Sequence, residues 1–164
     1  MGIYSYIMDY SLKRKIKKKL EGIKCMGTDL KIFGVPDFIH PSGISIGDHV
    51  NINDGVILNA TDSEIFIGNS VTISSNAMIL AASYDVDKFL SGEAGSKKHK
   101  YGKIIIGDNV WICAGAIILP NVSIRDHVVV VVVAAGSVVV KDITETWCVV
   151  AGNPAKVVKR IEHE

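Results

Sequence analysis

An aliphatic residue recurs at every sixth position through much of the chain from residue 44 onward. These positions are Ile46, Ile52 and Leu58, then Ile67, Ile73 and Ile79, then Ile106, Ile112, Ile118, Ile124 and Val130. A period of six does not match the 3.6-residue period of an α-helix, but it suits short strands whose inward side chains stack on the next coil. Burial of each such side chain contributes roughly 1.5–3 kcal/mol. The repeat predicts an all-β fold of stacked coils.

Four segments of the repeat begin alike. They are IGDHV (46–50), IGNSV (67–71), IGDNV (106–110) and IRDHV (124–128). The last two start three hexads apart, so one triangular coil of three short strands forms the repeating unit. Glycine follows the inward aliphatic at Gly47, Gly68 and Gly107, where we expect the chain to need room to turn.

Three departures from the period predict insertions. The first two segments are three residues further apart than one coil requires, which places extra residues near Thr61–Glu64. The polar, lysine-rich stretch 83–103 breaks the pattern and predicts a projecting loop, a common place for function on a rigid scaffold. The extra valines 131–133 predict a local bulge, for which the sequence offers no purpose.

The N-terminal part has a different pattern. In residues 11–24, Leu12, Ile16, Leu20 and Ile23 form one helical face surrounded by basic residues. We interpret this helix as a cap on one end of the domain with its lysines in solvent, although such a basic face could also rest on an anionic membrane surface. The predicted organisation is a helix and leading segment over 1–40 and a β-helix domain over 41–164.

Bulk properties exclude several classes of protein. A net charge of +1 gives no case for nucleic-acid binding. The cysteines Cys25, Cys113 and Cys148 are far apart and form no CxxC motif, which favours a reduced, cytoplasmic protein without a metal site. No segment resembles a signal peptide, and the longest apolar run, 128–135, is much shorter than the roughly 20 residues that span a bilayer.

Three stretches of the repeat resemble a known family. They are IGDNVWICAGAIILPNVSI (106–124), AAGSVVVKDI (134–143) and VVAGNPAKVVKRI (149–161). Over about residues 40–161 the chain resembles the hexapeptide-repeat sugar O-acetyltransferases, such as galactoside and maltose acetyltransferases and those that modify bacterial surface polysaccharides. The resemblance implies a left-handed parallel β-helix of hexapeptide repeats. It also implies a homotrimer that binds acetyl-CoA between two subunits and acetylates a hydroxyl of a sugar or glycan.

The same resemblance implies the residues of the acetyl-CoA site. Trp111 matches the tryptophan that lines the family's site, Ala114 follows it along the same wall, and Ala135 matches the small residue that faces the pantetheine arm. The basic positions near the nucleotide phosphates match Lys141, Lys156 and Lys159. Cationic side chains are also the expected partners of phosphate on electrostatic grounds.

The catalytic base is the chief departure from the family pattern. Transfer to a hydroxyl needs a group that takes the proton, and histidine suits this role because its pKa lies near working pH. Counted from Gly68 without gaps, the family's histidine position is Tyr84 here. Three hypotheses stay open: His99, near the end of the same loop, is the base; Tyr84 takes part itself, its pKa lowered by nearby lysines; or the base is missing and activity is weak.

Carboxylates are the candidates for contact with the acceptor. The gap-free count places Asp54 and Asp62 at the family's sugar-contacting positions, and Asp85 could orient a histidine or lie in solvent. The remaining histidines, including His40 and His49, are interpreted as surface residues.

Two rival functions remain from the sequence, and a third is excluded by it. An N-acetyltransferase of an amino sugar, possibly carried on a nucleotide, would use the same cofactor groove. A catalytically weak hexapeptide-repeat scaffold would bind partners along its flat faces. A zinc-dependent γ-type carbonic anhydrase needs two histidines five residues apart, and this sequence has no such pair.

Overall fold

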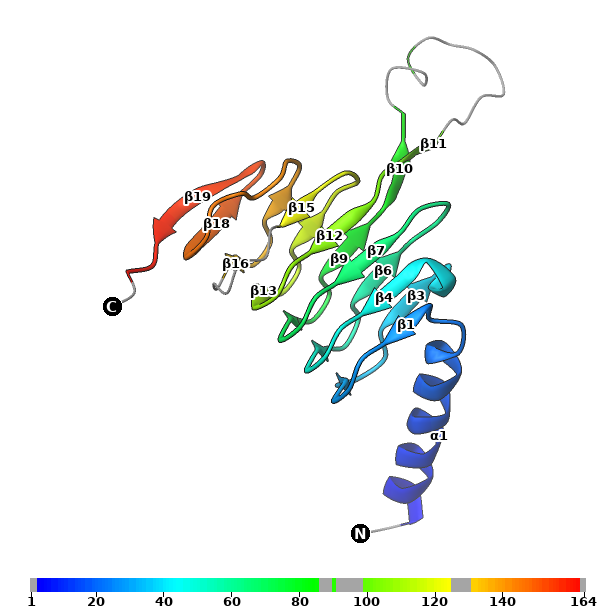
Figure 1. Cartoon of the computed structure of the whole chain (residues 1–164). Helices are drawn as coiled ribbons and strands as arrows, with labels where there is room; N and C mark the ends of the chain where they lie inside the picture. Colours follow the sequence, from blue (N-terminus) through cyan, green and yellow to red (C-terminus); the bar gives the residue numbers. More distant parts are fainter. Residues whose placement is uncertain (1–2, 86–89, 91–98, 125–130, 163–164) are drawn as a thin grey trace.

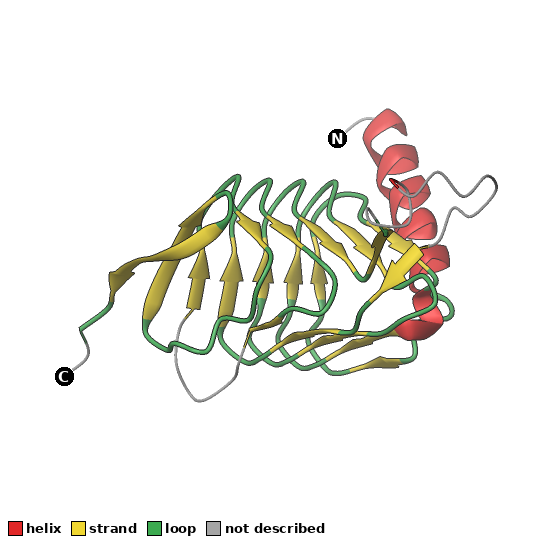
Figure 2. Ribbon diagram, turned by 90° about the horizontal axis from the view of Figure 1, so that it is seen from above, coloured by secondary structure: helices red, strands yellow, loops and turns green. Residues whose placement is uncertain are grey.

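The chain folds as a left-handed parallel β-helix, as predicted, with one helix at its N-terminal end (Figure 1). The computed structural model describes residues 3–85, 90, 99–124 and 131–162. In that part of the chain, three parallel sheets form the walls of a triangular prism, and each coil contributes one strand to each wall in turn. Viewed from above, the coils stack along the length of the prism (Figure 2).

The strands of each wall follow one another along the prism. The first sheet contains β1 (Cys25–Met26), β4 (Ile44–Ile46), β7 (Ile65–Ile67), β12 (Ile104–Ile106) and β15 (Ser123–Ile124). The second contains β2 (Lys31–Ile32), β5 (Asn51–Ile52), β8 (Thr72–Ile73), β13 (Val110–Ile112), β16 (Val131–Val133), β18 (Cys148–Gly152) and the antiparallel β19 (Ala155–Arg160). The third contains β3 (Asp37–Ile39), β6 (Ile57–Asn59), β9 (Met78–Leu80), β14 (Ile117–Ile118) and β17 (Val138–Val139).

Three corners join the walls. We call the turn from the first sheet to the second the first corner, the turn from the second sheet to the third the second corner, and the turn back to the first sheet the third corner. In a triangular prism the third corner lies opposite the second sheet. The third corner also carries a short 3-10 helix (Pro41–Gly43) and an antiparallel hairpin of β10 (Ala82–Tyr84) and β11 (His99–Tyr101).

The predicted inward aliphatic residues form the core. Every one of them that the structure describes is 4% exposed or less, with Ile67 the most exposed. A second inward set, two residues earlier in each hexad, is equally buried and was missed from the sequence. It includes Ile44, Val50, Val56, Ile65 and Val71. Side chains two apart on a strand share one face, so each short strand or its adjoining corner supplies two inward residues rather than one.

The glycines after the inward aliphatics have a different role from the one predicted. Gly47, Gly68 and Gly107 do not have positive φ angles, so turning freedom is not the requirement. A Cβ atom on Gly47 would lie 2.8 Å from the carbonyl carbon of Gly68, and a Cβ on Gly68 would lie 2.8 Å from that of Gly107. Glycine is needed because neighbouring coils approach closely at the first corner.

The predicted insertions lie at corners. The extra residues near Thr61–Glu64 are confirmed, since β6 ends at Asn59 and β7 begins at Ile65. The stretch 83–103 leaves the prism through the β10–β11 hairpin, and most of its tip lies outside the described residues.

The prediction of a bulge at Val131–Val133 is wrong. These valines form β16 and pair in register with Val110–Ile112, with Val131 and Val133 fully buried. Because Ile124 pairs with Ile106, the three extra residues lie between Ile124 and Val131, in the segment 125–130 outside the described residues. Val130, predicted to point inward, belongs to that segment.

The β-helix begins further toward the N-terminus than residue 41. Strands β1, β2 and β3 pair in parallel with β4, β5 and β6, so a complete first coil lies within the predicted leading segment. Helix α1 (Ile3–Leu20) projects from this end of the prism, and Lys19 Nζ lies 2.7 Å from Asp37 Oδ1 on β3 (Figure 1). Within the described residues, no helix has the length and apolar character needed to cross a membrane.

Candidate functional site

The hairpin at the third corner brings the two candidate bases together. Tyr84 on β10 pairs directly with His99 on β11, and their ring centroids are 4.7 Å apart. Tyr84 is 58% exposed, and the His99 ring is exposed as well. The imidazole therefore lies against an aromatic face and is open to an incoming molecule.

Tyr101 joins this cluster and was not found from the sequence. It lies two residues after His99 on the same strand, with ring centroids 5.8 Å apart. Partial burial raises the pKa of Tyr101, and a hydrogen bond to Asp62 raises it further. The phenol therefore stays protonated at neutral pH and links the hairpin to Asp62 in the turn after β6. Alternate residues of a strand share one face, so the position of Tyr101 two residues after His99 is the signal that could have identified it.

Trp111 lies on the outer face of the second sheet. Its ring is 50% exposed, and Nε1 donates a hydrogen bond to Ser74 Oγ at 3.0 Å. Strand register then places Val132, Val149 and Lys159 in one row across the sheet from Trp111. The row offers an aromatic surface, an apolar wall and, at its end, a cation.

Ala114 and Ala135 occupy the second corner on neighbouring coils. Gly136 N–H, next to Ala135, donates to the carbonyl of Ala114 at 3.0 Å, and both alanines are exposed. A Cβ atom on Gly136 would meet nothing within 4 Å, so this corner faces open space. The corner has no bulky side chain at these positions.

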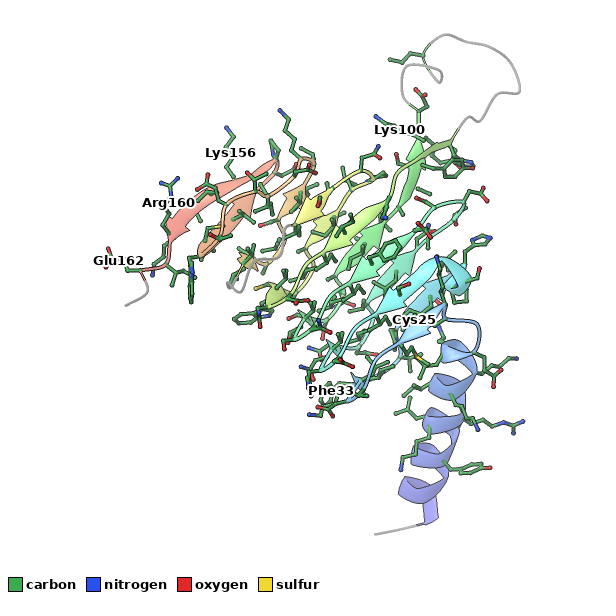
Figure 3. All side chains as sticks on the ribbon, viewed as in Figure 1. Cys25, Phe33, Lys100, Lys156, Arg160 and Glu162 are labelled. Carbon is green, nitrogen blue, oxygen red and sulfur yellow. The ribbon has the colours of Figure 1, made fainter. Side chains whose placement is uncertain are left out.

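The predicted lysines gather at the C-terminal end of the prism. Lys156 on β19 pairs with Ala151, beside the second corner, and its side chain projects away from the ribbon (Figure 3). Lys141 and Lys156 line one hollow of about 210 Å³. Lys159 lies at the end of the Trp111 row. The structure brings these three cations to the same end of the molecule.

The acceptor-side carboxylates are divided, with Asp54 at a different corner from Asp62 and Asp85. Asp54 is at the second corner, where Oδ1 accepts the N–H of Val35 at 2.7 Å and so connects two coils. Asp62 is at the third corner beside Tyr101. Asp85 follows Tyr84 at the end of β10 and is half-buried.

The predicted site residues therefore form two groups on opposite sides of the prism. The third-corner group contains Asp62, Tyr84, Asp85 and His99. The other group, on the second sheet, the second corner and the adjoining end, contains Asp54, Trp111, Ala114, Ala135, Lys141, Lys156 and Lys159. Because the third corner lies opposite the second sheet, one protomer cannot bring His99 to Trp111. Among the described residues, no cluster of three or more His, Cys, Asp or Glu side chains could hold a metal ion.

The fold and sequence are similar to those of known acetyltransferases. A maltose O-acetyltransferase from Clostridium difficile 630 is 32% identical, with a TM-score of 0.77 over 90% of this chain and 75% of that one. A hexapeptide-repeat-containing acetyltransferase from Vibrio cholerae O1 biovar eltor, complexed with acetyl coenzyme A, is 26% identical, with a TM-score of 0.74 over 96% and 79% of the two chains.

One curated relative is a galactoside O-acetyltransferase of Lactococcus lactis, 35% identical over 120 residues. This match covers 70% of the chain and 55% of that enzyme. No protein-family model matches the sequence. Identity of 32% to the maltose enzyme over three quarters of its length, together with the shared β-helix, shows that this chain belongs to the hexapeptide-repeat acetyltransferases, the family and enzyme class that its motifs predicted.

Proposed function

We propose that the protein transfers the acetyl group of acetyl-CoA to a hydroxyl of a sugar or glycan at a site formed between two subunits of a homotrimer. The observation that carries this proposal is the division of the site residues between opposite sides of one prism. The acetyl-CoA-bound Vibrio cholerae enzyme and the galactoside and maltose enzymes support the donor and the acceptor class.

The third sheet supports the trimer. Its outer face presents a row of aliphatic side chains that pair across neighbouring strands: Ile57, Met78, Ile117 and Val138. Such a face favours burial against other subunits. The third sheet lies between the second and third corners. If it faces a threefold axis, the third corner of each subunit lies beside the second corner of the next, as a closed ring of head-to-tail contacts requires.

This arrangement assigns a role to each group. His99 and Tyr84 of one subunit would face Trp111, Ala114 and Ala135 of its neighbour. The exposed small residues at the second corner would let the pantetheine arm approach the backbone. Trp111, with its indole held by Ser74, would form one wall of the groove, and Lys141, Lys156 and Lys159 would bind the nucleotide phosphates.

The chemistry needs one proton acceptor. His99 takes the proton of the acceptor hydroxyl as that oxygen attacks the thioester carbonyl, and the proton then passes to the sulfur of the departing coenzyme A thiolate. Tyr84, whose ring contacts that of His99 at a tilt of 39°, holds the imidazole in place. Tyr84 as the base and a site without a base are the alternatives, and they predict different variant behaviour.

A second candidate function is N-acetylation of an amino sugar. AntD, an N-acyltransferase from Bacillus cereus seen with dTDP and coenzyme A, is 26% identical, with a TM-score of 0.64 over 89% of this chain and 88% of that one. An amine and a hydroxyl acceptor would share the groove. Treatment with mild base distinguishes the two products, because it hydrolyses an acetyl ester and leaves an acetamide intact.

The test is a thiol-release assay with acetyl-CoA against a panel of sugars and amino sugars, with product mass before and after mild base. Base-labile acetylated sugar supports the proposal, and a base-stable product supports the alternative. A scaffold would release no thiol and would show no thermal shift with coenzyme A, which would contradict both.

A further inference from the structure

A histidine that the mechanism does not use lies at the third corner, two coils before the hairpin. His40, between β3 and the 3-10 helix, has a left-handed backbone with φ of 53°. Its ring reaches the next coil, where Nδ1 lies 2.9 Å from Thr61 Oγ. His40 is exposed, so its other ring nitrogen can meet a ligand.

The hydrogen bonds of Thr61 fix the tautomer of this ring. Thr61 Oγ donates its single proton to Asn59 Oδ1 at 2.6 Å, and Thr61 N–H donates to the same oxygen at 3.0 Å. The proton between His40 and Thr61 must therefore come from Nδ1. A neutral imidazole that carries its proton on Nδ1 has an acceptor lone pair on Nε2. Among the described residues, Nε2 has no hydrogen-bond partner.

His40 lines a hollow next to the third-corner group. The hollow is about 310 Å³ and also contains Ser42, Asp62, Ser63 and Glu64. This volume lies at the lower end of the about 300–1,000 Å³ typical of small-molecule sites. Asp62 connects the hollow to the hairpin through its hydrogen bond with Tyr101, whose ring neighbours His99. A molecule held in this hollow would contact Asp62, which Tyr101 joins to the hairpin that carries the proposed base.

The lining of the hollow is rich in acceptors. His40 Nε2 and the Asp62 carboxylate can accept hydrogen bonds, and the Glu64 carboxylate has one oxygen 2.6 Å from Lys24 Nζ and its other oxygen as a further acceptor. A polyhydroxylated sugar offers hydroxyl donors to match them. We propose that His40 is a specificity-determining residue of the acceptor site, whose Nε2 accepts a hydrogen bond from a sugar hydroxyl. This inference rests on the proposed function, because it names the group that this site recognises.

The test compares His40→Asn with His40→Gln. Asparagine tolerates the left-handed backbone and keeps a donor for Thr61, but it has no group at the Nε2 position. Glutamine can place an amide oxygen close to that position. We expect His40→Asn to raise the acceptor KM about three- to tenfold, the effect of one neutral hydrogen bond, with kcat and the acetyl-CoA KM unchanged. His40→Gln should recover part of the loss. An unchanged acceptor KM in His40→Asn, with an active wild type, overturns the proposal.

A second measurement does not depend on turnover. Long-range ¹H–¹⁵N spectra of the histidine rings, assigned with His40→Asn, should show the proton of His40 on Nδ1. Thr61→Val should mix the tautomers, and addition of the preferred sugar should move the Nε2 resonance. A ring that carries its proton on Nε2, or an Nε2 signal that no sugar moves, overturns the inference. Failure of wild-type protein to acetylate any sugar or amino sugar overturns the proposed function instead.

Discussion

His99 and Tyr84 meet because two short antiparallel strands place them directly opposite each other, with ring centroids 4.7 Å apart. Two candidates that the sequence offered as rivals thus become neighbours with different uses. A phenol whose ring packs against an imidazole can hold that imidazole, whereas an imidazole has the pKa suited to a base near neutral pH.

We predict that His99→Ala lowers turnover in the thiol-release assay by at least about 10²-fold, because a general base typically contributes 10²–10⁴-fold. Coenzyme A binding should be retained, since His99 is not among the residues proposed to bind the cofactor. Tyr84→Phe keeps the ring contact and should lose far less activity. Full activity in both variants would remove His99 and Tyr84 from the mechanism.

Asp48, at the first corner, has a stabilising role that depends on pH. Its Oδ1 accepts the N–H of Thr28 at 2.6 Å and the Thr28 hydroxyl at 2.9 Å, and these bonds lower the pKa of the carboxyl below its usual value. A carboxyl with a lowered folded-state pKa stabilises the fold above its unfolded pKa, near 3.9. That stabilisation is lost as the pH falls through the folded pKa.

The variant Asp48→Asn tests the direction of this pH dependence. Asn69 occupies the equivalent position on the next coil and accepts the N–H of Asp48 through Oδ1, so an asparagine fits this corner. The melting temperature of the variant should lie below that of the wild type at pH 7, and the two should converge as the pH falls below about 4. A difference in melting temperature that stays constant from pH 7 to pH 3 would contradict this role of Asp48.

At the scale of the coil, the first corner is a place where neighbouring coils approach closely. Gly47, Gly68 and Gly107 stack so that a Cβ added to Gly47 or Gly68 meets the backbone of the next coil. By contrast, Gly136 at the second corner has open space around it, but its φ of 67° is left-handed. The two corners use glycine for different physical reasons, close approach in one case and backbone conformation in the other.

A matched pair of variants separates these reasons. Gly136→Ala should lower the free energy of unfolding by roughly 1–2 kcal/mol, the cost of a left-handed conformation for a residue with a Cβ. Gly68→Ala should lower the free energy of unfolding by more than this, because a backbone carbonyl of the next coil must move. Urea unfolding of both variants measures the difference. A smaller loss for Gly68→Ala would show that the coils can separate locally.

At the scale of the whole molecule, we propose that the site is completed by a second subunit. One protomer holds its proposed base and its proposed cofactor wall on opposite sides, so we expect the catalytic unit to be the interface between copies. The aliphatic outer face of the third sheet would supply the apolar surface for that assembly. Sedimentation velocity should show a trimer, and Met78→Lys should shift it toward monomer with loss of activity.

Mixed trimers test the shared site directly. His99→Ala and Trp111→Ala subunits, each of low activity alone, should regain activity when unfolded and refolded together. With random mixing in a closed trimer, about a quarter of the interfaces join an intact base to an intact cofactor wall. The mixture should therefore recover about a quarter of wild-type turnover. No recovery, with mixed trimers confirmed by mass spectrometry, would place both residues in one subunit's own site.

The sequence by itself determined the coil. A six-residue period and the alternation of side chains are local properties, so the inward aliphatic residues, the insertion at Thr61–Glu64 and the family motifs could be predicted without the fold. The second inward set was also present in the pattern, as Val50 and Val56 illustrate, but only one residue of each hexad was identified.

Only the tertiary structure decided on which side of the prism each residue lies. The separation of His99 from Trp111, the register that puts Val131 and Val133 inward, and the pairing of Tyr101 with Asp62 depend on which coil stacks on which. The same holds for His40, whose ring is oriented by Thr61, a residue one coil away. Paired strands of neighbouring coils join residues 17 to 39 positions apart, and insertions at the corners set their register, so no local pattern could have specified these contacts.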